Sequence, residues 1–459
     1  MSIDSRLVLT EEIHAALREH LFPGDGLEAA AVLVCTRFAG EHLKLLAKHL
    51  ILVPYDECTE RDANYITWPG SYLEQGIDLA EGESLSIILV HSHPGGYFAF
   101  SEVDDQSDAK TIPSLYQGVE AIHGSAIMVP SGAVRARLYD QHMNCSPVAL
   151  VTVPGDDISY WWESSPLTRK PPIAFTSGMT ANLNRLSAAV IGVSGTGSIV
   201  AETLARLGFG EVILIDYDHI EVKNLNRILN STLADAKAGR PKVEMFADAI
   251  NRLRETPFAR PINESIETRE AVLAAAGADV IFSCVDTLQA RMVADLIATS
   301  FLIPLFDVGV KIPTRIDSYG DRDIADVAGR IDYVKPGGSS LGDRGVYTPE
   351  KLQAEYLYRV DRQAHQDQID QGYIRGMQEE APAVITLNMR AASACVSEFI
   401  ARAFLFREED NCRYARTTFT LSGCEEDFYT EKSFPASPKP RLAEGGKEPL
   451  LGLPDLSAR

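Results

Sequence analysis

Helical and extended patterns alternate along the first 145 residues. Residues 9–21 place apolar side chains at helical spacing, whereas residues 29–35 and 86–92 are apolar runs of strand length that include β-branched residues. Residues 125–140 then form two strand patterns around a Ser-Gly turn. Residues 1–145 therefore predict one compact α+β domain.

Proline and tryptophan interrupt this pattern after residue 145. Residues 146–176 contain five prolines together with the adjacent Trp161 and Trp162. Solvated linkers seldom carry two tryptophans side by side, so we expect a linker that makes docking contacts of its own.

A second periodicity begins near residue 188. An apolar strand, a glycine-rich turn, a helix and another apolar strand form a βαβ unit, and residues 278–286 and 303–309 predict further strands. We therefore expect a doubly wound, Rossmann-like α/β domain with a mostly parallel sheet over residues 177–430. The Pro-, Gly- and charge-rich residues 431–459 are predicted to be disordered.

Composition narrows the class of protein. A chain of 459 residues is long enough for two or three domains. Its formal charge of -21 disfavours a nucleic-acid surface, which relies on clustered Lys and Arg. No apolar run is long enough to span a bilayer, and the N-terminal residues lack the pattern of a secretion signal, so we expect a cytoplasmic protein. Scattered cysteines without a CxxC pair indicate reduced thiols rather than a disulfide framework or a zinc ribbon.

Two histidines close the predicted strand at residues 86–92. In an extended chain the side chains of His91 and His93 point to the same face, so both imidazoles can reach one metal ion. The Pro-Gly-Gly segment that follows turns the chain back, which lets Asp104 supply a carboxylate. Two nitrogens, one oxygen and an open fourth position are the arrangement of a catalytic zinc site. The alternative for an isolated His-x-His pattern is a pair of surface histidines.

The complete pattern is more specific than the histidine pair. Seven residues separate His93 from Ser101, and Asp104 follows three positions later. This spacing resembles the JAMM motif of the JAB/MPN metalloprotease family, and the resemblance covers roughly residues 8–142. It implies that His91, His93 and Asp104 bind zinc and that Ser101 helps to stabilise the oxyanion of a tetrahedral intermediate.

The JAB/MPN family also uses a glutamate at the start of an upstream strand as its general base, which passes a proton from water to the leaving amine. Glu28 lies just before the predicted strand at residues 29–35, where this glutamate is expected. Asp56 and Glu57 are alternatives, and the simpler interpretation of Glu28 is a solvated carboxylate. Family members hydrolyse isopeptide or peptide bonds after the C-terminal glycine of ubiquitin-like proteins. We expect the same class of bond to be cleaved here.

A glycine-rich turn opens the predicted helix of the βαβ unit. Gly192, Gly195 and Gly197 leave backbone N–H groups and a helix N-terminus free to bind phosphate. Asp216 ends the next strand, where a carboxylate can bind a ribose hydroxyl. These features alone fit a dinucleotide-dependent dehydrogenase as well as an ATP-binding enzyme.

Charged residues beyond the turn favour adenylation. Adenylation needs cations that stabilise the charge moving onto pyrophosphate and a carboxylate that holds Mg²⁺, whereas hydride transfer needs neither. After the turn come Asp216 and Asp218, then Asn224 with Arg227, and later Lys242 and Asp286. This order of residues resembles the ubiquitin-activating (E1), MoeB and ThiF superfamily over about residues 177–406. By that resemblance Asp286 binds magnesium, and Arg227 and Lys242 also act in catalysis. The candidate ATP-binding residues are Gly192, Gly195, Gly197, Asp216, Asp218, Asn224, Arg227 and Lys242.

Two departures from the superfamily pattern concern the turn and the thiols. Ser194 stands where relatives usually have a further glycine. No cysteine lies between Asp286 and Cys395, so the thioester step and the structural zinc of many relatives lack their usual residues. Cys412 and Cys424 are candidate carriers of an activated chain, whereas Cys395 lies in an apolar helical segment and is expected in the core.

Together these features predict a bifunctional enzyme of a bacterial-type ubiquitin-like modification pathway. It would cleave after the C-terminal glycine of a ubiquitin-like protein and adenylate the carboxylate of that tail, with Zn²⁺, ATP and Mg²⁺. An E2-like protein is a further candidate partner, and a homodimer is expected because relatives of the adenylating domain are generally dimeric. The alternatives are sulfur-carrier activation for cofactor or metabolite synthesis, a ubiquitin-like-binding scaffold with a decayed site and, more distantly, a Rossmann oxidoreductase.

Overall fold

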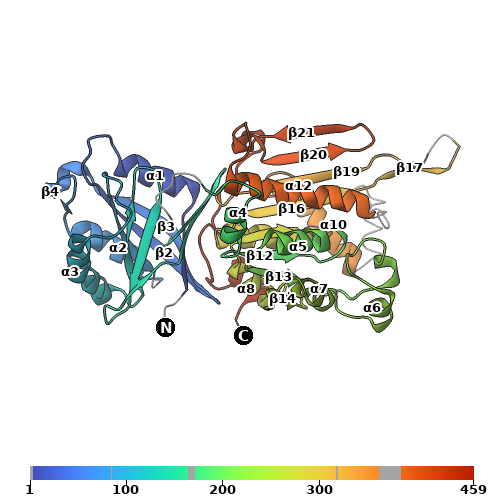
Figure 1. The fold of residues 1–459 in the computed structure, drawn as a ribbon, viewed down its shortest axis with the longest axis horizontal. Coiled ribbons are helices and arrows are strands. Elements are labelled where there is room, and N and C mark those ends of the chain that lie inside the picture. Colours follow the sequence, from blue (N-terminus) through green and yellow to red (C-terminus); the bar gives the residue numbers. More distant parts are fainter. Residues whose placement is uncertain (1–3, 84, 164–170, 317–318, 361–383, 459) are drawn as a thin grey trace. The chain divides into compact units, whose positions relative to one another are not determined.

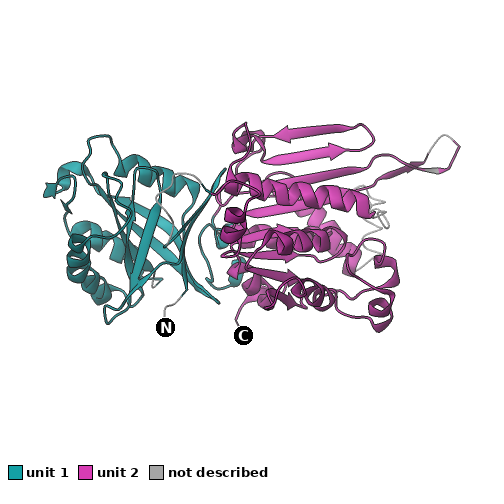
Figure 2. Cartoon of the chain, viewed as in Figure 1, with its two compact units in different colours: residues 1–171, 299–302, 440–452 teal, residues 172–298, 303–439, 453–459 magenta. Residues whose placement is uncertain are grey.

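The computed structural model describes residues 4–83, 85–163, 171–316, 319–360 and 384–458. The chain divides into two compact units, which Figure 2 shows in different colours. Unit 1 comprises residues 1–171, 299–302 and 440–452, and unit 2 comprises the remainder. Within the described ranges, no helix combines the length and the apolar character that a membrane crossing requires.

A nine-stranded sheet forms the centre of unit 1, in the order β11-β10-β1-β3-β2-β6-β7-β8-β9 (Figure 1). Most neighbouring strands are antiparallel, but β6 and β7 run parallel, as do β1 and both of its neighbours. The main strands are β1 (Ser5–Val8), β2 (Ala30–Ala39), β3 (Leu43–Leu52), β6 (Ser86–Ser92), β7 (His123–Met128) and β8 (Val134–Tyr139). The edge strands are β9 (Cys145–Pro147) and β11 (Ile158–Trp162), and β10 (Leu150–Pro154) lies between β11 and β1.

Strand β2 shows how this sheet is buried. Its alternate residues enter two different apolar clusters, one with Leu33 and the other with Val32. Helix α1 (Glu11–Leu21) packs on the first cluster, whereas α2 (Ser71–Glu81) and α3 (Glu102–Gly118) pack on the second. Because helices cover both faces, the central strands are continuous apolar runs rather than alternating ones. A short hairpin of β4 (Glu60–Arg61) and β5 (Ile66–Thr67) follows the 3₁₀ turn at Tyr55–Glu57.

The segment predicted as a linker belongs in large part to this sheet. Strands β10 and β11 pair with each other, and β10 also pairs with β1, so unit 1 extends beyond residue 145 to Pro171. Pro147 ends the edge strand β9, where the missing N–H of proline is tolerated, and Pro154 is the last residue of β10. Trp161 packs on the core of unit 1, and its ring lies 5.5 Å from that of His14. The expected docking contacts are therefore present, but they are contacts of a sheet.

The predicted disorder after residue 430 is also wrong for residues 431–458. The 3₁₀ turns Glu431–Ser433, Leu450–Gly452 and Pro454–Leu456 shape this segment. Ala443 is 1% exposed, and its carbonyl accepts a hydrogen bond from Thr36 Oγ1 at 2.7 Å within unit 1. Composition predicted disorder because the segment is rich in Pro, Gly and charge, but Ala443, Leu450, Leu451 and Leu456 are buried.

Unit 2 is built on an eight-stranded sheet in the order β14-β13-β12-β15-β16-β19-β20-β21. The first five strands are parallel and the last three are antiparallel. They are β14 (Ala259–Ile262), β13 (Glu211–Ile215), β12 (Ser187–Ile191), β15 (Val280–Ser283), β16 (Leu305–Lys311), β19 (Ala328–Val334), β20 (Arg416–Thr420) and β21 (Glu425–Tyr429). A hairpin of β17 (Thr314–Ile316) and β18 (Arg322–Ile324) extends from β16.

Helices connect and cover the strands of unit 2. Figure 1 shows α5 (Gly195–Leu207) and α12 (Ile385–Phe404) lying side by side across the front of the sheet, where they contact each other. The other helices are α4 (Ser177–Leu183), α6 (Leu233–Ala238), α7 (Lys242–Asn251), α8 (Arg269–Gly277), α9 (Leu288–Ser300) and α10 (Pro349–Val360). The mixed α/β fold class predicted for both halves is thus confirmed.

Deleting the Thr36 hydroxyl tests the packing of the C-terminal segment. Thr36→Val is expected to lower the free energy of unfolding of unit 1 by about 1 kcal/mol, because the buried hydrogen bond to Ala443 is lost. All three tryptophans lie in unit 1, so urea unfolding followed by tryptophan fluorescence measures this unit. Thr176→Val, which removes an exposed hydroxyl bond to Ile173, should leave the same signal unchanged. Equal effects of the two substitutions would contradict the packing.

Candidate metal centre and nucleotide site

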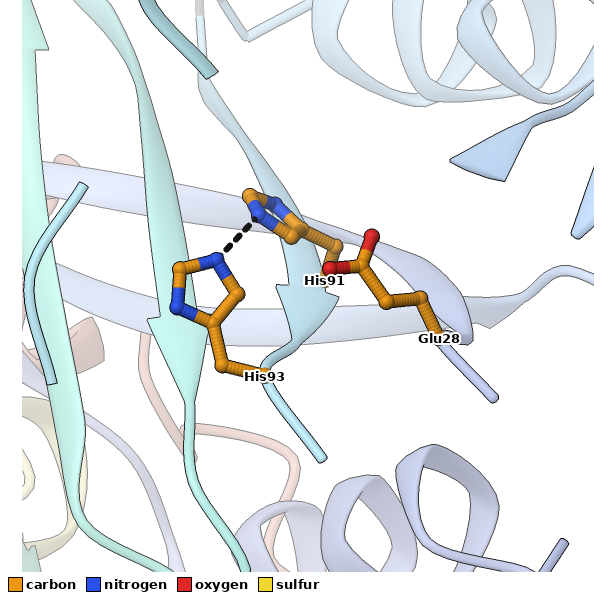
Figure 3. A group of neighbouring side chains, drawn as sticks. All are labelled: Glu28, His91 and His93. Atoms are coloured by element: carbon orange, nitrogen blue, oxygen red, sulfur yellow. Dashed lines mark hydrogen bonds between the residues drawn. The ribbon is translucent and has the colours of Figure 1, made fainter. Parts of the chain in front are cut away.

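Strand β6 delivers two histidines to one face of unit 1. The strand is buried from Ser86 to Val90, and His91 is its first partly exposed residue. Ser92 points the other way, where its Oγ accepts a hydrogen bond from Ala29 N at 2.9 Å. His93 lies on the same side as His91, and its backbone N–H donates to Met128 O at 2.8 Å. Figure 3 shows both imidazoles converging with the carboxylate of Glu28.

The donor atoms of His91, His93 and Asp104 are close enough to share one ion. His91 Nε2 lies 3.1 Å from His93 Nε2 and 3.0 Å from Asp104 Oδ1, and His93 Nε2 lies 3.4 Å from Asp104 Oδ2. Tetrahedral zinc with bonds of about 2.0–2.1 Å requires ligand atoms about 3.3 Å apart. Glu28 also belongs to the group, because its carboxylate and the two imidazoles offer ligand atoms within 4.8 Å of one another.

Hydrogen bonding determines which nitrogen of His93 faces the centre. Its Nδ1 lies 2.7 Å from the carbonyl oxygen of Tyr97, and a carbonyl can only accept, so Nδ1 carries a proton. In the neutral ring the lone pair of Nε2 then faces the Asp104 carboxylate. At 3.4 Å either a proton on Nε2 or a metal ion can lie between these two atoms, so Nε2 is the nitrogen available to a metal. A metal-binding histidine held through its second nitrogen fits a zinc site.

A helix cap orients the Asp104 carboxylate. Ser101 is the N-cap of α3, and its Oγ accepts from Asp104 N at 3.2 Å. In return Asp104 Oδ2 accepts from Ser101 N at 2.6 Å, which completes a capping box. Burial alone would raise the pKa of Asp104, but hydrogen bonds from His91 and His93 hold it well below its usual range. Ser101 therefore has a defined structural part in this geometry.

Backbone bonds hold Glu28 beside the histidines. It lies two residues before β2, and its N–H donates to Asp62 O at 2.7 Å while its carbonyl accepts from Arg61 Nε at 2.6 Å. The side chain is 5% exposed, and this burial raises the pKa of Glu28. The alternatives Asp56 and Glu57 lie on an exposed 3₁₀ turn outside the group. A pocket of about 310 Å³ adjoins the site, lined by the β4–β5 hairpin and α3.

In unit 2 the predicted glycine turn follows β12. Gly192 has a φ of +86°, and a Cβ at Gly197 would lie 1.7 Å from Gly192 O, so only glycine fits both positions. Gly195 begins α5, and its Cβ would meet Asn388 Nδ2 at 2.2 Å and Arg227 Cδ at 3.1 Å. The Ser194 side chain makes no capping bond to this helix. The first turn of α5 thus keeps an anion-binding end that suits phosphate.

Two aspartates and a lysine assemble beside the turn. Asp216 Oδ2 accepts from Val193 N at 2.7 Å, and its Oδ1 accepts from Asp218 N at 2.9 Å. Lys242 opens α7, is 4% exposed and places its Nζ 2.6 Å from Asp218 Oδ2. Burial raises the pKa of Asp216, although Lys242 opposes the shift. A buried lysine held next to the glycine turn fits a nucleotide phosphate.

The other predicted nucleotide residues lie around the same turn without all being bonded to it. Asn224 is buried and caps the 3₁₀ turn Val222–Asn224 through a bond from Glu221 N. Arg227 is half-buried against Gly195. Asp286 is exposed after β15, and it raises the pKa of Tyr217 together with burial and Asp218.

Comparison with known proteins agrees with both halves. Residues 10–141 match the prokaryotic homologs of the JAB domain, and residues 171–414, more than half of the chain, match the ThiF family. The chain belongs to the ThiF family. This ThiF-family protein therefore carries a JAB domain followed in the sequence by an E1-like domain, as the sequence predicts.

Individual relatives match this ThiF-family protein over part of their length. The ubiquitin-like modifier-activating enzyme 5 of Culex quinquefasciatus is 29% identical over 167 residues, which are 34% of this chain and 38% of the relative. That of Caenorhabditis elegans is 31% identical over 160 residues, or 32% and 35%. The chain thus spans less than two fifths of these curated relatives. E. coli MccB, solved with ATP, covers 58% of this chain and 69% of its own at 16% identity, with a TM-score of 0.42.

The structure adds a buried network that the sequence pattern misses. Arg137 on β8 donates through Nε to Asp108 Oδ2 at 2.9 Å, and Ser125 Oγ and Tyr139 Oη bond the same oxygen at 2.5 and 2.9 Å. Arg137 also pairs with Asp105. The network holds α3, which carries Asp104, against β7 and β8. No local spacing links these residues, so only their pairing across the sheet reveals them.

Asn388 and the cysteines complete the account of unit 2. Asn388 is 2% exposed and lies against Gly195, although only its place at the start of the predicted apolar helix marks it in the sequence. Cys395 is fully buried on α12, as expected, and burial raises its pKa well above the usual range. Cys412 and Cys424 are exposed.

Zinc retention tests the metal centre. After dialysis against excess zinc and then buffer, the protein is expected to retain about one zinc ion per chain, and His91→Ala should retain far less, as measured by elemental mass spectrometry. His142→Ala removes an exposed histidine of the same unit and is the matched control. Equal zinc in the two variants would place the metal elsewhere.

Breaking the buried pair tests the network behind α3. Arg137→Met leaves the Asp108 carboxylate buried without its cation, so the free energy of unfolding of unit 1 should fall by about 3–5 kcal/mol. Urea unfolding followed by tryptophan fluorescence measures it. The double variant Arg137→Met/Asp108→Leu should recover part of the loss because no charge remains unpaired. If the free energy of unfolding of the single variant falls by less than about 1 kcal/mol, the Arg137–Asp108 pair contributes little to the stability of unit 1.

Proposed function

We propose that this chain is a bifunctional enzyme of a ubiquitin-like modification pathway. Its JAB domain cleaves the bond after the C-terminal glycine of a ubiquitin-like protein, and its ThiF domain adenylates the carboxylate of that tail. The observation that supports the first activity is the convergence of His91, His93 and Asp104 with the buried Glu28. The second is supported by the glycine turn and its buried Lys242.

In the proposed hydrolysis, Glu28 moves protons while His91, His93 and Asp104 hold the metal. A zinc ion bound there would act as a Lewis acid that makes water nucleophilic and polarises the scissile carbonyl. Burial keeps the proton affinity of Glu28 high, so Glu28 can accept a proton from water and pass it to the leaving amine. Ser101 is the proposed oxyanion residue, in addition to its capping bond.

In the proposed adenylation, a carboxylate oxygen of the tail attacks the α-phosphorus of ATP, the bond to the β-phosphate oxygen breaks and pyrophosphate leaves. No proton is required. Arg227 and Lys242 neutralise the charge that moves onto pyrophosphate, Asp216 binds the ribose and Asp286 holds magnesium. Asp218, Asn224 and the glycines of the turn complete the proposed site. We include a homodimer and an E2-like partner in the proposal.

Names of relatives favour ubiquitin-like carriers over sulfur carriers as the partner. Several curated relatives of the ThiF domain are ubiquitin-like modifier-activating enzymes. Sulfur transfer would also need a thiol or an outside sulfide, and no cysteine lies between Asp286 and Cys395. The exposed Cys412 and Cys424 are the proposed sites if an activated chain is carried as a thioester.

Intact-mass spectrometry tests both activities in one reaction. Purified protein with zinc, Mg²⁺ and ATP is incubated with ubiquitin-like proteins that end in Gly-Gly and carry a four-residue extension. We expect loss of the extension and then an AMP adduct on the trimmed tail. With the extended carrier, His91→Ala should abolish both the trimming and the adduct, but it should still form the adduct on a carrier supplied already trimmed. Asp286→Ala should abolish only the adduct. Unchanged masses of both carriers with a zinc-loaded, folded protein would reject the proposal, whereas an adduct only on the carrier supplied already trimmed would retain only the second activity.

A further inference from the structure

A second pocket in unit 2 is lined by basic side chains. It has a volume of about 570 Å³ and lies over the ends of β16, β19, β20 and β21 and the start of α9. Six basic and two acidic side chains line it. The lining is therefore mainly basic, although the formal charge of the whole chain is -21.

Two buried aspartates organise four arginines at the floor of the pocket. Asp307 is 0% exposed and binds Arg291 at 3.2 Å and Arg330 at 2.5 Å. Asp332, equally buried, binds Arg330, Arg344 and Arg416 at 2.7, 3.2 and 2.8 Å. Glu431 also pairs with Arg344 at 2.8 Å, so three carboxylates hold four guanidinium groups in place and one positive charge remains in excess.

Gly309 leaves room above two of these arginines. A Cβ at this position would lie 3.1 Å from Arg330 Nη2 and 3.6 Å from Arg291 Nη2. Without a side chain at residue 309, both guanidinium groups border open space in the pocket. Paired guanidinium groups with fixed geometry suit a carboxylate, because each can donate two parallel N–H bonds.

Two lysines add charge at the exposed part of the lining. Lys311 is exposed and interacts electrostatically with Asp326, and Lys351 Nζ is hydrogen-bonded to the carbonyl of Gly345 at 3.1 Å. The acidic lining residues, Glu425 and Asp427, both lie on β21, an edge strand that β19 and β20 separate from β16. Arg291 on α9, Lys311 on β16 and Arg330 on the neighbouring β19 lie away from these two carboxylates in the sheet order.

The pocket continues the sheet edge that carries the proposed nucleotide residues. Gly192, Asp216 and Asp286 follow parallel strands at their carboxyl ends, and Gly309 lies at the same end of the neighbouring β16. Leu288, two residues after Asp286, lines the pocket. A peptide whose terminal carboxylate lies at the nucleotide would have its preceding residues near this pocket.

We propose that the pocket binds an acidic side chain of the tail that the ThiF domain activates, through Arg291, Arg330 and the flanking Lys311 and Lys351. The proposal rests on the proposed adenylation and deepens it by naming the tail chemistry. It predicts a carrier with Glu or Asp a few residues before its terminal glycine. A phosphate site is the competing use of the same charges.

Peptide binding to the full-length protein tests the pocket without requiring catalysis. The probes are two fluorescent ten-residue peptides that end in Gly-Gly and differ only in Glu or Gln at the upstream positions. By fluorescence anisotropy the Glu peptide should bind at least about tenfold tighter than the Gln peptide, a difference of about 1.4 kcal/mol. High salt should reduce this affinity ratio. Lys311→Glu and Lys351→Glu should bring the ratio close to one. Arg252→Glu, the same charge change at the exposed C-cap residue of α7, should not.

Other outcomes separate this inference from the proposed function. Equal binding of the Glu and Gln peptides to the wild-type protein would overturn the pocket proposal, even if both support ATP–pyrophosphate exchange. Pyrophosphate binding that is lost in Lys311→Glu, together with no Glu preference, would make the pocket a phosphate site instead. A Glu preference that depends on Lys311, with no exchange for any peptide, would support the pocket and reject adenylation.

Discussion

Both candidate sites depend on apolar strands that are buried almost to their carboxyl ends, where the functional residues begin. In unit 1, β6 is buried from Ser86 to Val90, and the chemistry begins at His91. In unit 2 the same is true of β12 and β13, which end before Gly192 and Asp216. Burial on both faces fixes the backbone of such strands. The polar residues that follow are therefore held in defined positions by the buried strand, although they are not packed in the core themselves.

Buried carboxylates organise the surroundings of each site. Asp104 is shared between a helix cap and two imidazoles, and Asp108 holds Arg137 against α3. In unit 2, Asp307 and Asp332 hold four arginines in the same manner. A charge removed from water is costly unless it is paired and hydrogen-bonded. These aspartates therefore restrict their cationic and metal-binding partners to few arrangements, which suits sites that must recognise a defined ligand.

The two proposed reactions concern one chemical group, the C-terminal carboxylate of a glycine. Hydrolysis exposes that carboxylate, and adenylation activates it. Carrying both sites on one chain raises the effective concentration of the trimmed tail for the second reaction. A pocket that binds a side chain upstream of the terminal glycine would then select which tails are activated.

Local spacing in the sequence was enough for the metal pattern and the glycine turn. His91 and His93 lie on one face because a strand alternates, and the turn after β12 needs glycine because its backbone folds onto itself. The fold class and most strands follow from the same local periodicities. These features depend on residues that are near one another in the sequence, which a single sequence displays.

Contacts between distant segments could not be read in this way. Residues 146–162 and 440–452 lack strong periodicity, yet they are ordered because strands and side chains far away in the sequence bury them. Likewise, the sequence does not predict the roles of Arg137, Asn388 and the basic pocket, because these roles depend on contacts with residues on other strands and helices. The sequence by itself determined which local conformations and donor sets are available. The tertiary structure decided which of them meet, because burial and charge pairing depend on the surroundings that the folded chain provides.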